Sequence, residues 1–243
     1  MKKIFVIIPG LSIKSVLLNE ESIISAFSDF ANQFTIYLFD RIKNVPENYT
    51  IDEMANDTYN SMLNLWITSC NIFWASQWWM ITQCIALKHP NFIERMVLSS
   101  TTYKVELNAY NIFSEWISLA SQNNTLQLNK SFIQNVYSKE TIKEYWDSIL
   151  QSNKDVSEYE LQRFIKLATS LLDFNIENSI WKIKCKTLVI WSNNDKIFWW
   201  ESAKNLAEKL NGKLYLYENY WHGVYDEAPN FKKRILNFLC EQQ

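Results

Sequence analysis

The sequence contains only three glycines among its 243 residues. Average usage of roughly 7% would give about 17, and a compact fold uses glycine where the backbone adopts a positive φ or passes close to another element. Tryptophan, in contrast, occurs eleven times. Because its side chain is the bulkiest of all, tryptophan is the least suited to such positions. The shortage of glycine therefore makes the positions of the tryptophans informative.

Basic clusters and long apolar runs are also missing, and each absence excludes a class of protein. The formal net charge is −2, and no cluster of lysines and arginines offers a surface for nucleic acid, so we expect no nucleic-acid partner. No apolar run approaches the ~20 residues of a membrane span, so we expect no membrane partner. The short run at residues 4–8 ends at Pro9 and Gly10, which predicts a buried strand rather than a signal peptide.

Cysteine and histidine are few and scattered. The four cysteines, at positions 70, 84, 185 and 240, show neither CxxC spacing nor the density of a disulfide scaffold, so we expect a reducing, cytoplasmic environment. Only two histidines are present. With the scattered cysteines they form no ligand set, and the sequence implies no metal and no organic cofactor. It leaves the oligomeric state open.

Short apolar runs alternate with longer helical patterns, which is typical of βαβ units around a mostly parallel sheet. Thr50 and Glu53 have the spacing of a capping box and predict a helix beginning near Ile51. From about residue 103 to 180, amphipathic helical stretches replace the strand pattern. We therefore expect an α/β protein with a core of residues 1–102 and 181–243 and an inserted helical cap of residues 103–180. The predicted strands are residues 4–8, 35–39, 71–73, 95–99, 187–190 and 213–217.

The predicted strand at residues 71–73 leads into Ser76, and a helical pattern follows at once. This arrangement resembles the nucleophile elbow of the α/β-hydrolases, Gly-x-Ser-x-Gly with a further glycine commonly next. Trp74, Trp78 and Trp79 occupy those three glycine positions. The resemblance implies the α/β-hydrolase fold, with a mostly parallel central sheet flanked by helices, and Ser76 as nucleophile. Tryptophan at these positions should break the elbow, because strand and helix must pass closely there.

The resemblance extends to a segment after the first predicted strand. Residues 7–12, Ile-Ile-Pro-Gly-Leu-Ser, resemble the family's His-Gly segment, with Pro9 in place of the usual histidine. The resemblance implies that the backbone N–H groups of Leu11 and Gln77 form the oxyanion hole, although an ordinary turn after a strand stays possible. Asp40 and Arg41 match an Asp-Arg pair that ends the next strand in the family, and we expect a structural ion pair or a hydrogen-bond anchor there.

The candidates for the acid and the base lie late in the chain, which matches the family's chain order of serine, acid, histidine. The strand at residues 187–190 leads through Trp191, in a glycine slot, to Asp195, and His222 lies between Trp221 and Gly223 where the family often has Gly-His-Gly. The resemblance therefore implies Asp195 as the orienting acid and His222 as the general base.

These residues together imply a serine hydrolase that cleaves a small carboxylic ester or lactone through an acyl-enzyme, with specificity set by the cap. A thioesterase, C–C hydrolase or acyltransferase with the same triad stays open, and so does a catalytically inactive, hydrolase-like binding protein. A carbohydrate-binding module with exposed indoles is less favoured. The tryptophans lack the period of two expected on strands and fall next to the triad candidates.

Most of the tryptophans stand at turns, helix ends or strand ends, where glycine would be ordinary. The exceptions are Trp116, Trp146 and Trp181, which sit in patterns that accept an aromatic residue. Because independent mutations would have introduced many residue types, we expect one codon to be the cause: UGA, read as glycine in the source organism and translated here as tryptophan. The eight positions are Trp66, Trp74, Trp78, Trp79, Trp191, Trp199, Trp200 and Trp221.

Overall fold

The computed structural model describes residues 2–8, 10–76, 79–152 and 154–241. Within these residues six parallel strands form one sheet, in the order β2-β1-β3-β4-β5-β6. All six predicted strands are confirmed, and every predicted end lies within two residues of the observed one. The strands are β1 (Lys3–Ile8), β2 (Phe34–Leu38), β3 (Cys70–Ala75), β4 (Ile93–Ser99), β5 (Lys186–Ser192) and β6 (Lys213–Tyr217).

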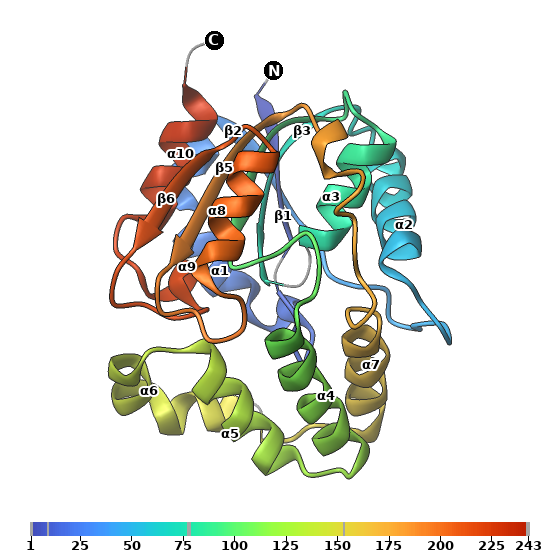
Figure 1. Ribbon diagram of the computed structural model, residues 1–243, viewed down its shortest axis with the longest axis vertical. Helices are drawn as coiled ribbons and strands as arrows, with labels where there is room; N and C mark the ends of the chain where they lie inside the picture. Colours follow the sequence, from blue (N-terminus) through green and yellow to red (C-terminus); the bar gives the residue numbers. More distant parts are fainter. Residues whose placement is uncertain (1, 9, 77–78, 153, 242–243) are drawn as a thin grey trace.

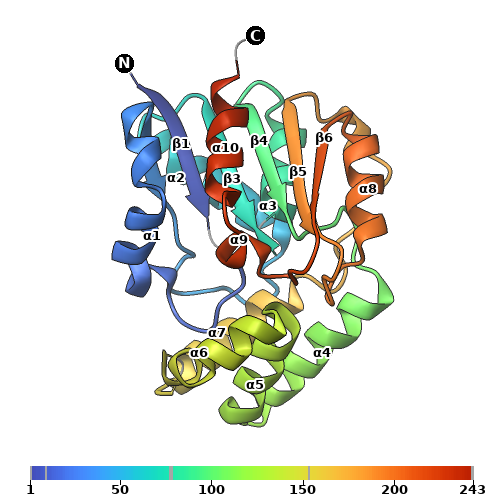
Figure 2. The same ribbon diagram turned by 90° about the vertical axis from the view of Figure 1, so that its left-hand side faces the viewer.

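Helices cover both faces of the sheet, which explains why the inner strands are apolar runs rather than alternating patterns. Val6, Ile72 and Val189 on three of these strands are fully buried. One face is covered by α1 (Glu20–Ala26) and α10 (Phe231–Cys240), and the other by α2 (Ile51–Asn64), α3 (Trp79–Lys88) and α8 (Trp200–Lys209) (Figures 1 and 2). The short helices are η1 (Val16–Asn19), η2 (Ser28–Asn32), η4 (Ile180–Lys182) and α9 (Val224–Glu227).

The predicted capping box at the start of α2 is confirmed. The Glu53 backbone N–H donates to the Thr50 hydroxyl at 3.2 Å, and the Thr50 backbone N–H donates to the Glu53 carboxylate at 2.8 Å. Two amides of the first turn that lack helical partners are satisfied in this way.

The carboxyl end of α2 has the hydrogen bonds of a Schellman motif. The Ile67 N–H donates to the Met62 carbonyl at 3.0 Å, and the Trp66 N–H donates to the Leu63 carbonyl at 2.9 Å. This geometry requires a left-handed residue at the second position after the helix, and glycine is the usual choice. Trp66 occupies that position with a φ of 60° and an indole that is 89% exposed.

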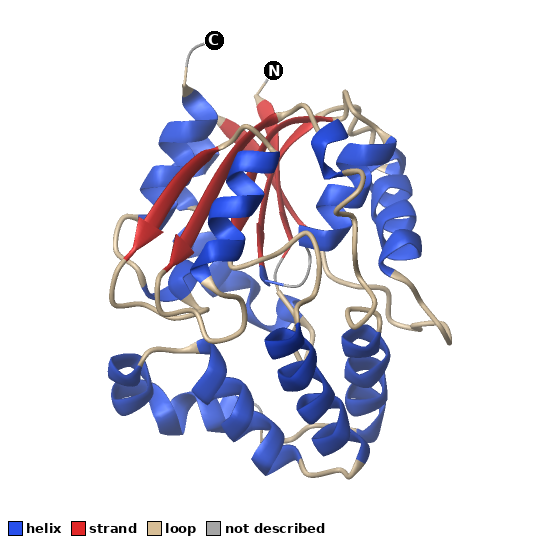
Figure 3. Cartoon of the chain, in the orientation of Figure 1, coloured by secondary structure: helices blue, strands red, loops and turns tan. Residues whose placement is uncertain are grey.

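Four further helices lie between β4 and β5, beyond the carboxyl ends of the strands, to which the strand arrows point (Figure 3). We refer to them as the cap helices, while the division into a core and a cap stays a prediction. No helix in the described part of the chain is long and apolar enough to cross a membrane. The cap helices are α4 (Leu107–Ser121), α5 (Thr125–Val136), α6 (Lys139–Ser152) and α7 (Glu158–Thr169).

The order of the strands creates one point where the chain changes direction across the sheet. From β1 the chain passes to β2 on one side, and β3 then pairs with β1 on the other side. Loops that follow such neighbouring strands diverge, and the crevice between them is where open α/β sheets bind ligands. The segments after β1 and β3, which carry Leu11 and Ser76, therefore lie at the expected position of a site.

Candidate active site

Ser76 lies in the turn between the end of β3 and the start of α3. Its φ is 62°, in the left-handed region that residues with a side chain rarely adopt. Such a conformation costs of order 1–3 kcal/mol and persists where the surrounding structure enforces it, often at functional sites. A sharp strand-to-helix turn with a strained serine presents the hydroxyl at the carboxyl edge of the sheet, as in a nucleophile elbow.

The structure brings Ser76 together with the two other predicted triad residues. His222 Nε2 lies 2.7 Å from Ser76 Oγ, and His222 Nδ1 lies 2.9 Å from Asp195 Oδ2. Asp195 follows β5 and His222 follows β6, so three parallel strands carry the three side chains to the same edge. With the proton on Nδ1, the neutral ring donates to the carboxylate and accepts a hydrogen bond from the serine hydroxyl.

The Asp195 carboxylate is withdrawn from solvent but well supplied with hydrogen-bond donors. Its side chain has no exposed surface, and that of His222 is 1% exposed. Besides the imidazole, the backbone N–H groups of Ile197 and Phe198 donate to Asp195 Oδ1 at 2.8 and 3.1 Å. A buried carboxylate is stable when such donors replace water. These two amides also fix the carboxylate relative to the imidazole.

The loop that carries His222 is held by groups that the sequence did not reveal. The Ser100 hydroxyl donates to the His222 carbonyl at 2.7 Å. The Gly223 N–H donates to the Val136 carbonyl at 2.6 Å, and a Cβ on Gly223 would lie 3.0 Å from the Tyr137 ring. Because that distance is tighter than most contacts of a Cβ atom, glycine at this position helps the end of α5 to approach the histidine. The position of Ser100 directly after β4 was the only signal in the sequence.

Of the two predicted oxyanion donors, the structure describes only Leu11. Leu11 lies three residues beyond β1 and is buried. Among the described residues, its backbone N–H has no hydrogen-bond acceptor. Gln77 lies outside the described residues, as do Pro9 and Trp78.

Asp40 and Arg41 both act as hydrogen-bond anchors, and their side chains bond to different groups. Asp40 Oδ2 accepts from the Ser15 hydroxyl at 2.5 Å, and its Oδ1 lies 3.6 Å from the guanidinium of Arg163 on α7. The Arg41 guanidinium instead donates to the Gly10 carbonyl at 2.5 Å. The pair therefore connects the end of β2 to the loop after β1.

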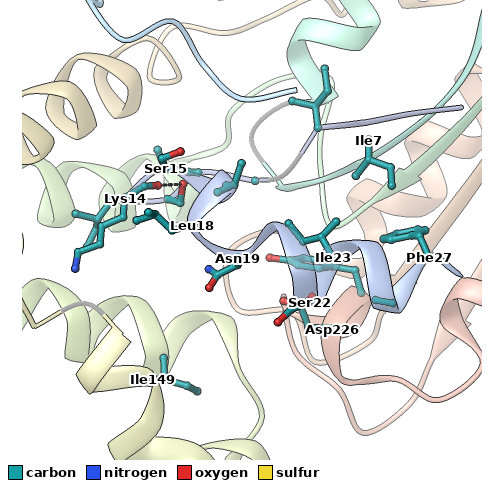
Figure 4. A pocket seen from close by; sticks show the side chains of 18 of the residues that line it. Ile7, Lys14, Ser15, Leu18, Asn19, Ser22, Ile23, Phe27, Ile149 and Asp226 are labelled. Atoms are coloured by element: carbon teal, nitrogen blue, oxygen red, sulfur yellow. Dashed lines mark hydrogen bonds between the residues drawn. The ribbon is translucent and has the colours of Figure 1, made fainter. Parts of the chain in front are cut away.

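A cavity of about 440 Å³ lies beside this loop (Figure 4). Ile23 and Phe27 from the core and Ile149 from α6 give it apolar walls, and Asp226 faces it (Figure 4). Burial raises the pKa of Asp226 to about 6. The described lining does not include Ser76 or His222. The cavity also borders Gly10, Leu11 and Tyr137, which connect it to the groups described above.

The second histidine takes no part in this arrangement. His89 follows the last residue of α3, and its ring stacks on Tyr59 with 3.6 Å between the ring centroids. Within the residues that the structure describes, no group of three or more His, Cys, Asp or Glu side chains could hold a metal ion.

Several solved structures share this arrangement of strands and helices. An α/β-hydrolase enzyme from a Medee basin deep-sea metagenome library superimposes with a TM-score of 0.91 at 23% sequence identity, over 100% of this chain and 90% of that one. The enol-lactonase from Burkholderia xenovorans LB400 gives 0.86 at 15% identity, over 99% of this chain and 93% of that one. This chain has the α/β-hydrolase fold.

Other proteins with the α/β-hydrolase fold match at similar levels. The esterase EaEST from Exiguobacterium antarcticum has a TM-score of 0.82 at 16% identity, over 99% of this chain and 93% of that one. No protein-family model matches the sequence, and neither does a curated protein. The similarity to these proteins is therefore one of fold.

Proposed function

We propose that this protein is a serine hydrolase that cleaves a small carboxylic ester or lactone through an acyl-enzyme. The observation that carries the proposal is the continuous chain of contacts from Ser76 Oγ through His222 to Asp195, with 2.7 and 2.9 Å between the bonded atoms. A serine, a histidine and a carboxylate in this geometry can activate a hydroxyl for attack on an acyl carbonyl.

In the proposed mechanism, His222 Nε2 removes the proton of Ser76 as Oγ attacks the carbonyl carbon. Asp195 holds the imidazole in the required tautomer and stabilises the imidazolium that forms. The imidazolium then gives its proton to the leaving alcohol oxygen, and an ester to Ser76 remains. Water, deprotonated by the same imidazole, attacks this ester and releases the acid, which returns Ser76 to its starting state.

The negative charge that develops on the carbonyl oxygen needs preorganised donors. We propose the backbone N–H groups of Leu11 and Gln77 for this role. The backbone N–H of Leu11, which has no acceptor among the described residues, supports the first. The cavity beside the same loop, whose volume falls within the roughly 300–1,000 Å³ of small-molecule sites, offers room for one of the two groups that flank the scissile bond.

A second part of the proposal concerns the residues that stand at the family's glycine positions. We propose that the eight tryptophans named above are encoded by UGA and are glycine in the native protein. The left-handed φ of Trp66 supports this at one position. Trp191 supports it at another, because its indole is fully buried and its Nε1 has no hydrogen-bond partner among the described residues, whereas a buried indole N–H usually has one.

Steady-state hydrolysis of a panel of p-nitrophenyl esters, thioesters and lactones tests the proposed activity. The panel should be run on the chain as given and on a version with glycine at the eight positions, each with its Ser76→Ala control. We expect the glycine version to be the more active and Ser76→Ala to abolish turnover. Hydrolysis of thioesters alone would instead indicate a thioesterase, and no turnover in either version would favour a binding protein. Codons other than UGA at the eight positions would refute the recoding.

A further inference from the structure

The loop that carries Leu11 is held by a side chain that the proposed mechanism does not use. Arg41 Nη2 donates to the carbonyl oxygen of Gly10 at 2.5 Å. The carbonyl of Gly10 and the N–H of Leu11 belong to the same peptide group, and the described chain contains no cis peptide bond. In a planar trans peptide the C=O and N–H bonds point in opposite directions. Fixing the Gly10 carbonyl on one side therefore fixes the direction of the Leu11 N–H on the other.

Arg41 starts from a position that is itself fixed. Its backbone N–H donates to Asp40 Oδ1 at 2.7 Å, while Asp40 Oδ2 accepts from the Ser15 hydroxyl at 2.5 Å. The Asp40 carboxylate thus connects the backbone of Arg41 to Ser15, and the guanidinium of Arg41 binds the same loop at Gly10. The segment between residues 10 and 15 is held at two points by adjacent residues after β2.

A cap helix contributes to the same anchor. Arg163 on α7 donates to the Arg41 carbonyl at 3.3 Å and lies 3.6 Å from Asp40 Oδ1. The side chains of Arg163 and Asp40 are only 7% and 10% exposed. Ion pairs shielded from water in this way are weakened little by salt. Arg163 therefore restrains the backbone of Arg41, while the bond to the Gly10 carbonyl restrains its guanidinium.

We propose that Arg41 is a positioning residue for the oxyanion hole, which orients the Leu11 N–H toward the developing oxyanion through the Gly10 carbonyl. This inference rests on the proposed function. Removing one oxyanion donor costs about 10²–10³ in kcat. Loss of Arg41 leaves the donor in place but free to rotate, so we expect a smaller decrease of about 10- to 100-fold. KM should change little, because the carbonyl of the bound substrate carries much less charge than the transition state.

The test compares Arg41→Met and Arg41→Lys with Arg95→Met, in whichever of the two chain versions hydrolyses esters. Arg95 is the control, because it is a buried arginine that, like Arg41, donates to the main chain, here to the carbonyls of Phe238 at 2.6 Å and Glu241 at 2.5 Å. It lies near the amino end of β4, at the opposite edge of the sheet from the site. The measurements are kcat, KM, the melting temperature and the inhibition constant of an alkyl boronic acid, which forms a tetrahedral adduct with a serine nucleophile.

We expect Arg41→Met to lower kcat about 10- to 100-fold and to weaken boronate inhibition by a similar factor, with KM within about threefold. Arg41→Lys, which keeps a cationic donor, should fall between the parent and Arg41→Met, and Arg95→Met should change only the melting temperature. The inference is wrong if folded Arg41→Met matches Arg95→Met in kcat and in boronate inhibition. If Arg41→Met does not fold, the same comparison is made with folded Arg41→Lys. Absence of Ser76-dependent turnover in both parent versions would instead overturn the proposed function and this inference with it.

Discussion

Replacing Trp66 by glycine should stabilise the protein, although such a change removes a large aromatic side chain. A residue with a Cβ in the left-handed region destabilises the folded state by roughly 1–2 kcal/mol, and replacing it by glycine removes this cost. Glycine loses more chain entropy on folding, which offsets roughly 0.5–1 kcal/mol of that gain. The indole is 89% exposed, so little buried surface is lost. We therefore expect the free energy of unfolding to rise by about 1 kcal/mol and the melting temperature by about 2–4 °C.

Two controls separate the backbone effect from the loss of an exposed indole, with thermal and urea unfolding followed by circular dichroism. Trp66→Ala removes the indole but keeps the Cβ, so we expect no comparable stabilisation. Trp181→Gly changes an exposed tryptophan in η4 whose Nε1 donates to the Asn178 carbonyl at 3.1 Å, and it should destabilise the protein, by about 1 kcal/mol. The reasoning fails if Trp66→Gly lowers the melting temperature, or if Trp66→Ala raises it equally.

Three further predictions concern the triad, an acid in the cavity and the thiols. In the active version, His222→Ala should lower kcat by about 10⁶-fold and Asp195→Asn by about 10⁴-fold, and steady-state rates within tenfold of the parent would contradict these roles. Burial raises the pKa of Asp226 to about 6, above its unfolded value, so the folded protein should lose stability as the pH rises from about 4 to about 6. Asp226→Asn should remove this decrease in the melting temperature. Parallel profiles of melting temperature against pH for the parent and the variant would refute the prediction. Cys240 is exposed, whereas burial raises the pKa of Cys84 to about 12, so a thiol reagent near pH 8 should modify Cys240 first, as peptide mapping can check.

Much of the fold could be predicted from the sequence because the signals were local. Strands buried on both faces give continuous apolar runs such as β1, and turn residues end them. The capping box at Thr50 and Glu53 likewise needs only two residues at a fixed spacing. The predicted strands at residues 71–73 and 187–190 end two residues before β3 and β5 do. A glycine slot predicts a turn at Trp74 and at Trp191, whereas the backbones of both residues continue the strands.

The contacts that fix the candidate site could not be predicted, because they join residues far apart in the chain. The bond from Ser100 to the His222 carbonyl spans 122 positions, and the contact between Arg163 and the Arg41 carbonyl spans another 122. Neither follows from a local pattern. The resemblance implies Ser76, Asp195 and His222, but the ion pair of Asp40 with Arg163 follows only from the packing of α7 against the core.

Covalent labelling of Ser76 tests the central claim most directly. A fluorophosphonate probe reacts with an activated serine, and mass spectrometry of the digested protein locates the adduct. With glycine at the eight positions, we expect one adduct, on the peptide that contains Ser76, and no labelling of the Ser76→Ala variant. A folded protein of this sequence that stays unlabelled at Ser76 would contradict the proposal that Ser76, His222 and Asp195 form a working catalytic triad.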